Sequence, residues 1–215
     1  LEGRYDPRDL DLSVDVQNVR ITDLVTGPLS DTLATLELGA LNITIDLKGQ
    51  LEPSLNLIVD ATIGEDGTGQ LADFNALVQD GNYEADFRLT HPDFLANGKG
   101  QYVIGTDSIV SVNAVVDLNR VDLQQWDITE VPLLLEGRLT AKSVGLDPYN
   151  MEGYVRLDTV KLRGDEGSSY VDSIVVTASL HDFDNEVLVR SDVLDAELVG
   201  VFDPVKTPEK IIQFI

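Results

Sequence analysis

The side chains of this sequence that could carry out acid–base or metal chemistry are few and far apart. The two histidines, His91 and His181, each precede a turn residue and have no zinc-like spacing to a carboxylate, so we interpret both as surface turn residues. The absence of cysteine excludes thiol catalysis, disulfides and cysteine-ligated zinc. The sequence also has no Gly-x-Ser-x-Gly elbow, phosphate-binding glycine loop or His-Glu-x-x-His motif. We therefore expect a protein that is not an enzyme and that needs no cofactor or metal.

Two acidic stretches and one tryptophan complete the candidates for ligand chemistry. Residues 64–67 and 182–186 contain the oxygen ligands that calcium prefers, but neither matches an EF-hand loop or a calcium-binding nonapeptide. Asp and Asn are favoured in turns by their own backbone hydrogen bonds, so we interpret both stretches as solvated turns. Trp126 has no aromatic neighbour in sequence, and we interpret it as pinning a connection between strands rather than stacking on a sugar.

The charge of the chain limits its partners. With 15 Lys+Arg against 38 Asp+Glu, the formal net charge is −23. Such a surface repels phosphate backbones and anionic lipid headgroups, so no nucleic acid is expected as a partner. Hydrophobic residues make up 43% of the chain and are spread evenly, which is enough to build a folded core.

The start of the chain and its hydropathy indicate whether this sequence contains a membrane anchor. The sequence begins at Leu1 without an initiator methionine, a basic n-region or an apolar h-region, which favours a fragment or a processed piece. No stretch approaches the roughly 18 apolar residues that a membrane-spanning helix needs. Any membrane anchor is therefore expected outside this sequence.

The elements that must position these side chains are predicted by a period of two. Within residues 41–51, every odd position is apolar or glycine and every even position is polar, as in a strand with one apolar face. The same alternation recurs in residues 10–16, 83–89, 110–118, 131–139 and 194–202. Turn residues occur between such segments, at 64–67, 80–82, 96–98, 164–167 and 182–185. This pattern predicts an all-β fold, a long antiparallel meander of about a dozen strands.

Two further features refine this organisation. Residues 1–203 are predicted to form the strand region, and residues 204–215 a short amphipathic helix with Thr207 as N-cap and Pro208 at its first position. A pattern of apolar-x-Gly-x-apolar recurs, centred on Gly3, Gly49, Gly137, Gly153 and Gly200. Because these glycines share the apolar face, we interpret them as sites where the sheet bends, and a bend also makes room for a guest.

The strand region from Asp117 to Phe202 resembles a known family. Its motifs are Asp117-Leu-Asn-Arg-Val-Asp-Leu123, Thr129-Glu-Val-Pro-Leu-Leu-Leu-Glu-Gly-Arg-Leu139, Met151-Glu-Gly-Tyr-Val-Arg-Leu157, Val171-Asp-Ser-Ile174 and Asp195-Ala-Glu-Leu-Val-Gly-Val-Phe202. They are similar to the repeated strands of TamB, the translocation and assembly module family related to AsmA-like proteins, and most closely to its Bacteroidetes-type versions.

The resemblance implies a fold, a location and partners. The sheet would curl into a U, a β-taco, with an apolar groove along its length. The parent protein would be anchored in the inner membrane, cross the periplasm and meet an outer-membrane barrel of the Omp85 class. The family is implicated in outer-membrane protein assembly and in carrying phospholipid between membranes. A fragment of its strand-repeat region would then lie in the periplasm of the cell envelope and shield phospholipid acyl chains.

An apolar face of this kind must be covered by a second sheet, by closure into a barrel or by curling around a guest. We expect the apolar groove to be lined by Leu47, Leu51, Val112, Val116, Leu133, Leu135, Leu139, Val155, Leu157, Ile174, Val176, Leu198 and Phe202. The main alternative is a β-sandwich adhesin or surface module whose apolar face is only core. A transmembrane barrel also alternates, but an aromatic content of 6% does not supply its interfacial girdles.

Overall fold

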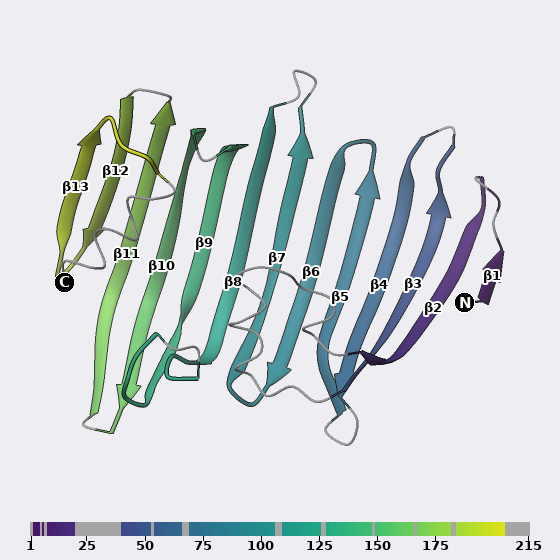
Figure 1. Ribbon diagram of the computed structural model, residues 1–215, viewed down its shortest axis with the longest axis horizontal. Helices are drawn as coiled ribbons and strands as arrows, with labels where there is room; N and C mark the ends of the chain where they lie inside the picture. The colour runs from purple at the N-terminus through teal and green to yellow at the C-terminus, as the bar shows by residue number, and fades with distance from the viewer. Residues whose placement is uncertain are drawn as a thin grey trace.

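The computed structural model describes residues 2–4, 6, 8–19, 40–52, 54–65, 69–105, 109–125, 128–147, 149–165, 167–181 and 184–204. These residues form one sheet of 13 antiparallel strands whose order in the sheet is their order in the chain (Figure 1). The strands are β1 (Glu2–Arg4), β2 (Leu10–Val19), β3 (Leu41–Gln50), β4 (Asn56–Glu65), β5 (Gly69–Gln79), β6 (Asn82–His91), β7 (Phe94–Ile104), β8 (Val110–Asp122), β9 (Leu133–Asp147), β10 (Asn150–Gly164), β11 (Gly167–His181), β12 (Asp184–Ser191) and β13 (Asp195–Gly200). The predicted all-β meander is confirmed.

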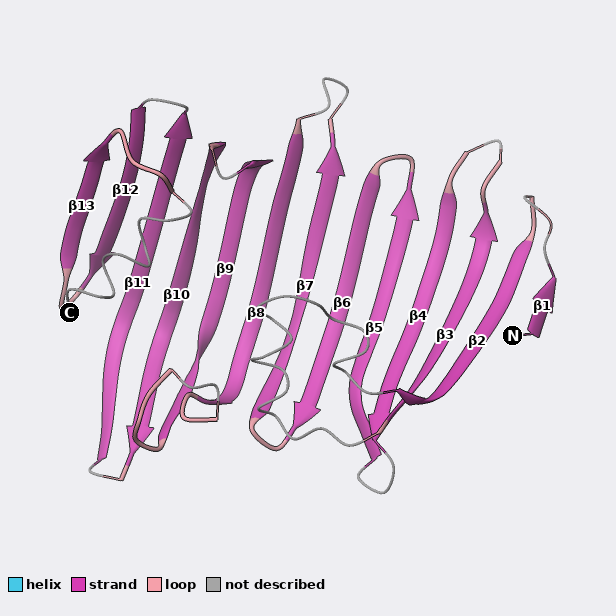
Figure 2. Ribbon diagram, in the orientation of Figure 1, coloured by secondary structure: helices cyan, strands magenta, loops and turns pink. Residues whose placement is uncertain are grey.

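The sheet is open rather than closed or strongly curled (Figure 1). The described strands make their substantial contacts only with their hydrogen-bonded neighbours, so these residues form a single layer. The sequence predicted a meander curled into a U, and the curl is absent from the described part of the sheet. Within that part there is no helix (Figure 2), while the helix predicted for 204–215 falls, from residue 205 onward, outside the described residues.

Short turns set the pairing register between strands. At the β5–β6 hairpin, Asp80 and Gly81 have φ values of 38° and 86°, the backbone that a two-residue turn matching the strand twist requires. This confirms the turn predicted at 80–82. At the β10–β11 hairpin, Gly164 pairs with Gly167, which confirms the turn predicted at 164–167.

One predicted turn needs correction. Residues 96–98 lie inside β7, and the turn before that strand is made by Pro92 and Asp93. At the β11–β12 hairpin, His181 pairs with Asp184, which confirms a turn in the predicted stretch 182–185, although Asp184 and Asn185 already belong to β12. Asn185 is only 2% exposed, and its side chain links the end of β11 to the residues that follow β13. Its Oδ1 accepts from the His181 amide at 3.0 Å, and its Nδ2 donates to the Phe202 carbonyl at 2.9 Å.

Bulges bend the sheet near one end of the long strands. Gly137 of β9 lies between two register shifts, one in β8 between Leu118 and Val121 and one in β10 between Asp158 and Lys161. The second contains Thr159, whose φ of 53° is unusual for a β-branched residue. The recurring glycine pattern thus coincides, at Gly137, with bulges in both neighbouring strands.

Few side chains are fully buried, as a single layer dictates. The buried apolar residues are Leu10, Leu41, Leu71, Ala96, Val121, Val160 and Leu180. Leu71, Ala96, Val121 and Val160 lie in or beside register shifts, where an extra residue is accommodated. Most other apolar strand residues are half-buried or exposed, so the large surface that a second layer would cover is still available for contact.

Candidate functional site

The two faces of the sheet are defined by the register, because residues directly opposite each other in an antiparallel pair point to the same side. One apolar row crosses ten strands, from β2 to β11. Its members, in sheet order, are Val14, Ile45, Ala61, Phe74, Phe87, Gly98, Val116, Leu139, Leu157 and Ile174. The alternation seen in each strand is therefore in phase across the sheet, and it creates one continuous apolar face.

A row of small side chains runs through the middle of this face. The five consecutive strands β5 to β9 each contribute an alanine or a glycine, and we call these residues the small-residue row: Ala76, Ala85, Gly100, Ala114 and Ala141. Four steps of about 4.8 Å between strands make this row about 19 Å long. A row of this kind was not recognised in the sequence because it exists only once the register is known.

Larger side chains flank the small-residue row on both sides. One flank contains Phe74, Phe87, Val116 and Leu139, and the other contains Val78, Tyr83, Tyr102 and Val112. The rings of Tyr83 and Tyr102 lie opposite each other, edge to face, with centroids 5.2 Å apart. Alanine and glycine project less far from the sheet than these neighbours, so the row lies lower than its flanks.

Two glycines on this face have different surroundings. A Cβ added to Gly98 would lie 2.8 Å from the Phe87 ring and 2.7 Å from the Val115 carbonyl oxygen, so the Phe87 ring occupies the place of the missing side chain. At Gly100, the nearest atom to such a Cβ would be 3.7 Å away. Gly98 is therefore already covered by a ring, whereas a Cβ at Gly100 would make only ordinary van der Waals contacts with its neighbours.

The predicted groove-lining residues divide into two groups. Eleven of the thirteen share the apolar face: Leu47, Val112, Val116, Leu133, Leu135, Leu139, Val155, Leu157, Ile174, Val176 and Leu198. Of these, Leu133 and Leu135 lie at the start of β9, where they pair with Gly164 and Leu162. The extra residues of the nearby bulges belong to β8 and β10, so the alternation of β9 is uninterrupted. Leu51 and Phe202 follow the ends of β3 and β13. Val155 is 43% exposed, which shows how accessible the centre of the apolar face is.

The opposite face carries the charges, and we call it the polar face. In its C-terminal half, arginines lie beside acids. Arg138 Nη1 is 3.5 Å from Asp117 Oδ1 on the neighbouring strand, and Arg163 Nη2 is 3.0 Å from Glu136 Oε1. In its N-terminal half, Asp46 and Asp60 are directly opposite each other, an arrangement that destabilises a strand pair.

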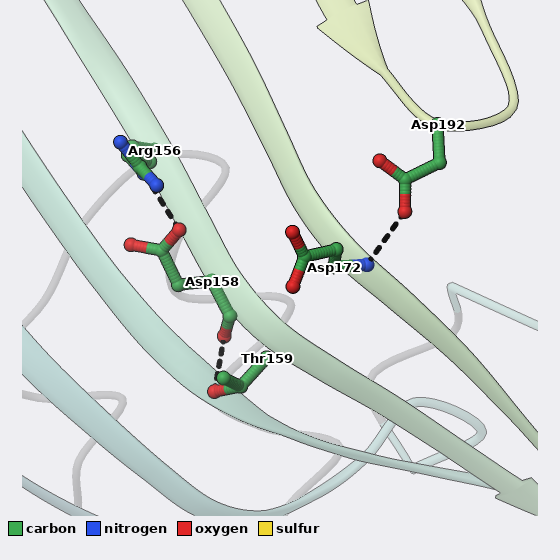
Figure 3. A network of polar contacts seen from close by, with 5 residues as sticks. All are labelled: Arg156, Asp158, Thr159, Asp172 and Asp192. Atoms are coloured by element: carbon green, nitrogen blue, oxygen red, sulfur yellow. Dashed lines mark hydrogen bonds and ion pairs between the residues drawn. The ribbon is translucent and has the colours of Figure 1, made fainter.

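The polar contacts around β10 and β11 are drawn in Figure 3. Arg156 Nε donates to Asp158 Oδ1 at 2.6 Å, and this hydrogen bond, followed by the charge of Asp158, raises the pKa of Arg156. The Thr159 hydroxyl donates to the Asp158 carbonyl at 2.7 Å, beside the bulge. The Asp172 amide, on the edge of β11 beyond its pairing with β12, donates to Asp192 Oδ2 at 2.9 Å. Side chains thus form hydrogen bonds with backbone groups near the places where regular pairing between strands is interrupted or ends.

The histidines occupy separate places in the fold. His91 ends β6, and its Nδ1 accepts from the Asp93 amide at 3.2 Å, within the turn. His181 ends β11, and its Nε2 lies 3.1 Å from Glu152 Oε1, a neighbour that only the register reveals. Within the described ranges, no group of three histidine or acidic side chains is arranged to hold a metal ion. Trp126 lies outside the described residues.

Comparisons of the chain with protein-family models, curated proteins and solved structures find no significant match. In the part of the chain that the structure describes, no helix is long and apolar enough to cross a membrane. The candidate functional site is therefore defined by its geometry alone: a continuous apolar face with a low central row and half-buried flanks.

Proposed function

We propose that this chain is a non-enzymatic periplasmic segment of a TamB-like protein, and that its apolar face shields lipid acyl chains for phospholipid transport and outer-membrane protein assembly. The observation that carries this proposal is the in-phase apolar face, which extends from β2 to β12 without a second layer among the described residues. A soluble protein rarely leaves so large an apolar surface without a partner that covers it.

The small-residue row supports an acyl chain as the guest. The row runs across the strands for about 19 Å, a length suited to an extended chain lying along the sheet. Ala85, Gly100 and Ala114 would lie beneath the chain, while Phe87 and Tyr102 on the two flanks would contact its sides. The face would bind the acyl chain of a lipid whatever its headgroup, because no charge on the face selects a headgroup.

The energetics favour a curled form when lipid is bound. Each methylene fully removed from water contributes about 0.8 kcal/mol, so a chain of about a dozen is stabilised by roughly 10 kcal/mol when enclosed. On an open sheet, one side of the chain stays in water and roughly half of this is lost. We propose that curling of the sheet into the U of a β-taco recovers that part, and that the bulges around Gly137 are points where it bends.

The proposed partners and location follow from the family resemblance. The parent protein would be anchored in the inner membrane, and an Omp85-class barrel in the outer membrane would receive its far end. The net charge of −23 supports this setting, because the acids on the polar face and in turns would keep an apolar conduit soluble between the membranes. The β-sandwich alternative needs a second sheet, and every described strand belongs to one sheet.

A pair of adjacent variants tests the proposal. Leu139 lies on the apolar face and Thr140, the next residue of β9, lies on the polar face. The protein is expressed in the periplasm of a Gram-negative host, purified without detergent, and its bound lipid is quantified by mass spectrometry. We expect lipid in the unmodified chain and in Thr140→Arg, and at least a tenfold loss in Leu139→Arg. Absence of lipid from the unmodified chain, or equal lipid in both variants, would contradict the proposal.

A further inference from the structure

The polar face contains a hollow that the proposed lipid function does not use. It has a volume of about 630 Å³ and lies over β7 to β11. Its lining combines the polar side chains of Gln101, Asn113, Lys142, Glu152, Tyr154 and Thr177 with the apolar side chains of Val103 and Val144. A smaller hollow of about 260 Å³ lies next to it over β6 to β8 and shares Gln101 and Asn113 with it. We call the two together the polar hollow. Its larger part falls within the range of roughly 300–1,000 Å³ typical of small-molecule sites.

One cross-strand row provides the floor of this hollow. Gln101, Asn113, Lys142, Tyr154 and Thr177 are successive direct partners on β7, β8, β9, β10 and β11. The row combines two amides, an ammonium group, a phenol ring and a hydroxyl. Because each residue is held by the ladder, their spacing across the strands is fixed at about 4.8 Å.

Several of these polar groups have no partner within the described part of the chain. The side chains of Asn113, Lys142 and Thr177 form no hydrogen bond or ion pair with any described residue, whereas Gln101 donates to Glu84 at 3.2 Å. Two rows further along the polar face the arrangement is different, since Arg138 lies between Asp117 and Asp158 and pairs with the former. Donors and acceptors in the hollow are therefore free to bind a ligand in place of water.

The chemistry of the lining selects the class of ligand. An anion is disfavoured because Lys142 is the one cationic residue of the larger hollow, Glu152 lies in the same hollow, and the chain carries a net charge of −23. A metal cation is disfavoured because Glu152 is the one carboxylate of the larger hollow, while in the smaller hollow Glu84 accepts from Gln101 and Asp86 lies directly opposite Lys99. An apolar ligand would find the opposite face better suited. A neutral ligand rich in hydroxyl groups matches the mixture of amides, hydroxyls and one aromatic ring.

We propose that the polar hollow binds a neutral saccharide, with Tyr154 contacting a sugar ring and Asn113 and Gln101 hydrogen bonding to its hydroxyl groups. The two adjoining hollows provide two subsites, so an oligosaccharide binds along the row, across the strands. The amides of Asn113 and Gln101 lie where the subsites meet and can donate and accept at both. This site lies on the face opposite to the small-residue row and does not depend on lipid binding.

The test uses two tyrosines of neighbouring strands. Tyr154 lies in the polar hollow, whereas Tyr170 of β11 is 63% exposed and lies outside it. Maltotriose, cellotriose and N,N′,N″-triacetylchitotriose, all neutral, are each titrated into the whole chain and followed by NMR chemical shifts. We expect saturable binding of at least one sugar, about a tenfold weaker Kd in Tyr154→Ala and an unchanged Kd in Tyr170→Ala.

Two further measurements keep the result interpretable. Circular dichroism confirms that each variant is folded, and Asn113→Ala provides a second, smaller change in the same hollow that should also weaken binding. Leu139→Arg, which is directed at the apolar face, should leave the Kd for sugar unchanged. The proposal is overturned if none of the three sugars shifts a resonance, or if Tyr154→Ala and Tyr170→Ala bind equally well.

Discussion

The two faces of this sheet are built from the same strands and the same register, yet they are organised by different properties. On the apolar face, cross-strand neighbours are matched by size: alanines and glycines line up across β5 to β9, with larger side chains on either side. On the polar face, neighbours in the C-terminal half are matched by charge, as at Asp117 and Arg138. The comparison shows that the register, rather than any single residue, determines what each face can bind.

The largest effect on stability is expected on the apolar face, at Gly98. Substitution Gly98→Val places a side chain against the Phe87 ring and the Val115 carbonyl, and we expect it to lower the free energy of unfolding by about 2–3 kcal/mol. Gly100→Ala, two residues along the same strand, places its methyl group at ordinary contact distance, 3.7 Å from the Asn113 carbonyl oxygen, and should change stability by less than about 0.5 kcal/mol. Urea denaturation followed by circular dichroism measures both. Equal effects would show that Phe87 does not cover Gly98 in solution.

A smaller effect is expected from the charges of the polar face. Arg138→Glu removes the pairing with Asp117 and creates a row of three acids with Asp158. We expect a loss of about 1 kcal/mol at low salt, because the groups are exposed and well hydrated. The loss should shrink in high salt, where the repulsion is screened. A double variant Asp117→Arg and Arg138→Glu should recover part of the stability, and failure to do so would contradict the pairing.

The smallest effect is a gain in the N-terminal half of the polar face. Asp46 and Asp60 are directly opposite on β3 and β4, so Asp60→Lys converts a repulsive pair into an attractive one. We expect an increase in stability of about 0.5 kcal/mol. Asp60→Asn, which removes the repulsion without adding an attraction, should give a smaller gain. A decrease in the denaturation midpoint with Asp60→Lys would show that the two carboxylates are not neighbours.

Much of the fold was predictable from the sequence because alternation and turn residues are local signals. The period of two located six of the strands, β2, β3, β6, β8, β9 and β13, and their two faces, and Asp80-Gly81 marked a hairpin correctly. The turn predicted at 96–98 was wrong because Gly98 serves to accommodate the Phe87 ring, and Pro92-Asp93 makes the turn instead.

The small-residue row was only partly accessible from the sequence. The two-residue turns at 80–81 and 92–93 fix the register of β5, β6 and β7, and this places Ala76, Ala85 and Gly100 in line. Beyond β7, bulges shift the register, and the alternation of each strand does not reveal a bulge. Leu133 and Leu135 lie beside bulges of β8 and β10, so their neighbours on those strands could not be assigned from alternation alone. The polar hollow likewise requires the full ladder from β7 to β11.

The strand order, which follows the chain from β1 to β13, has a consequence for how such proteins change in length. Each strand bonds only to its predecessor and successor, so inserting or deleting one hairpin adds or removes about 10 Å of sheet without changing any other connection. Both faces lengthen together, because the side chains of each new strand alternate between the apolar face and the polar face. Duplication of a segment that encodes one hairpin would therefore increase the width of the sheet by about 10 Å each time.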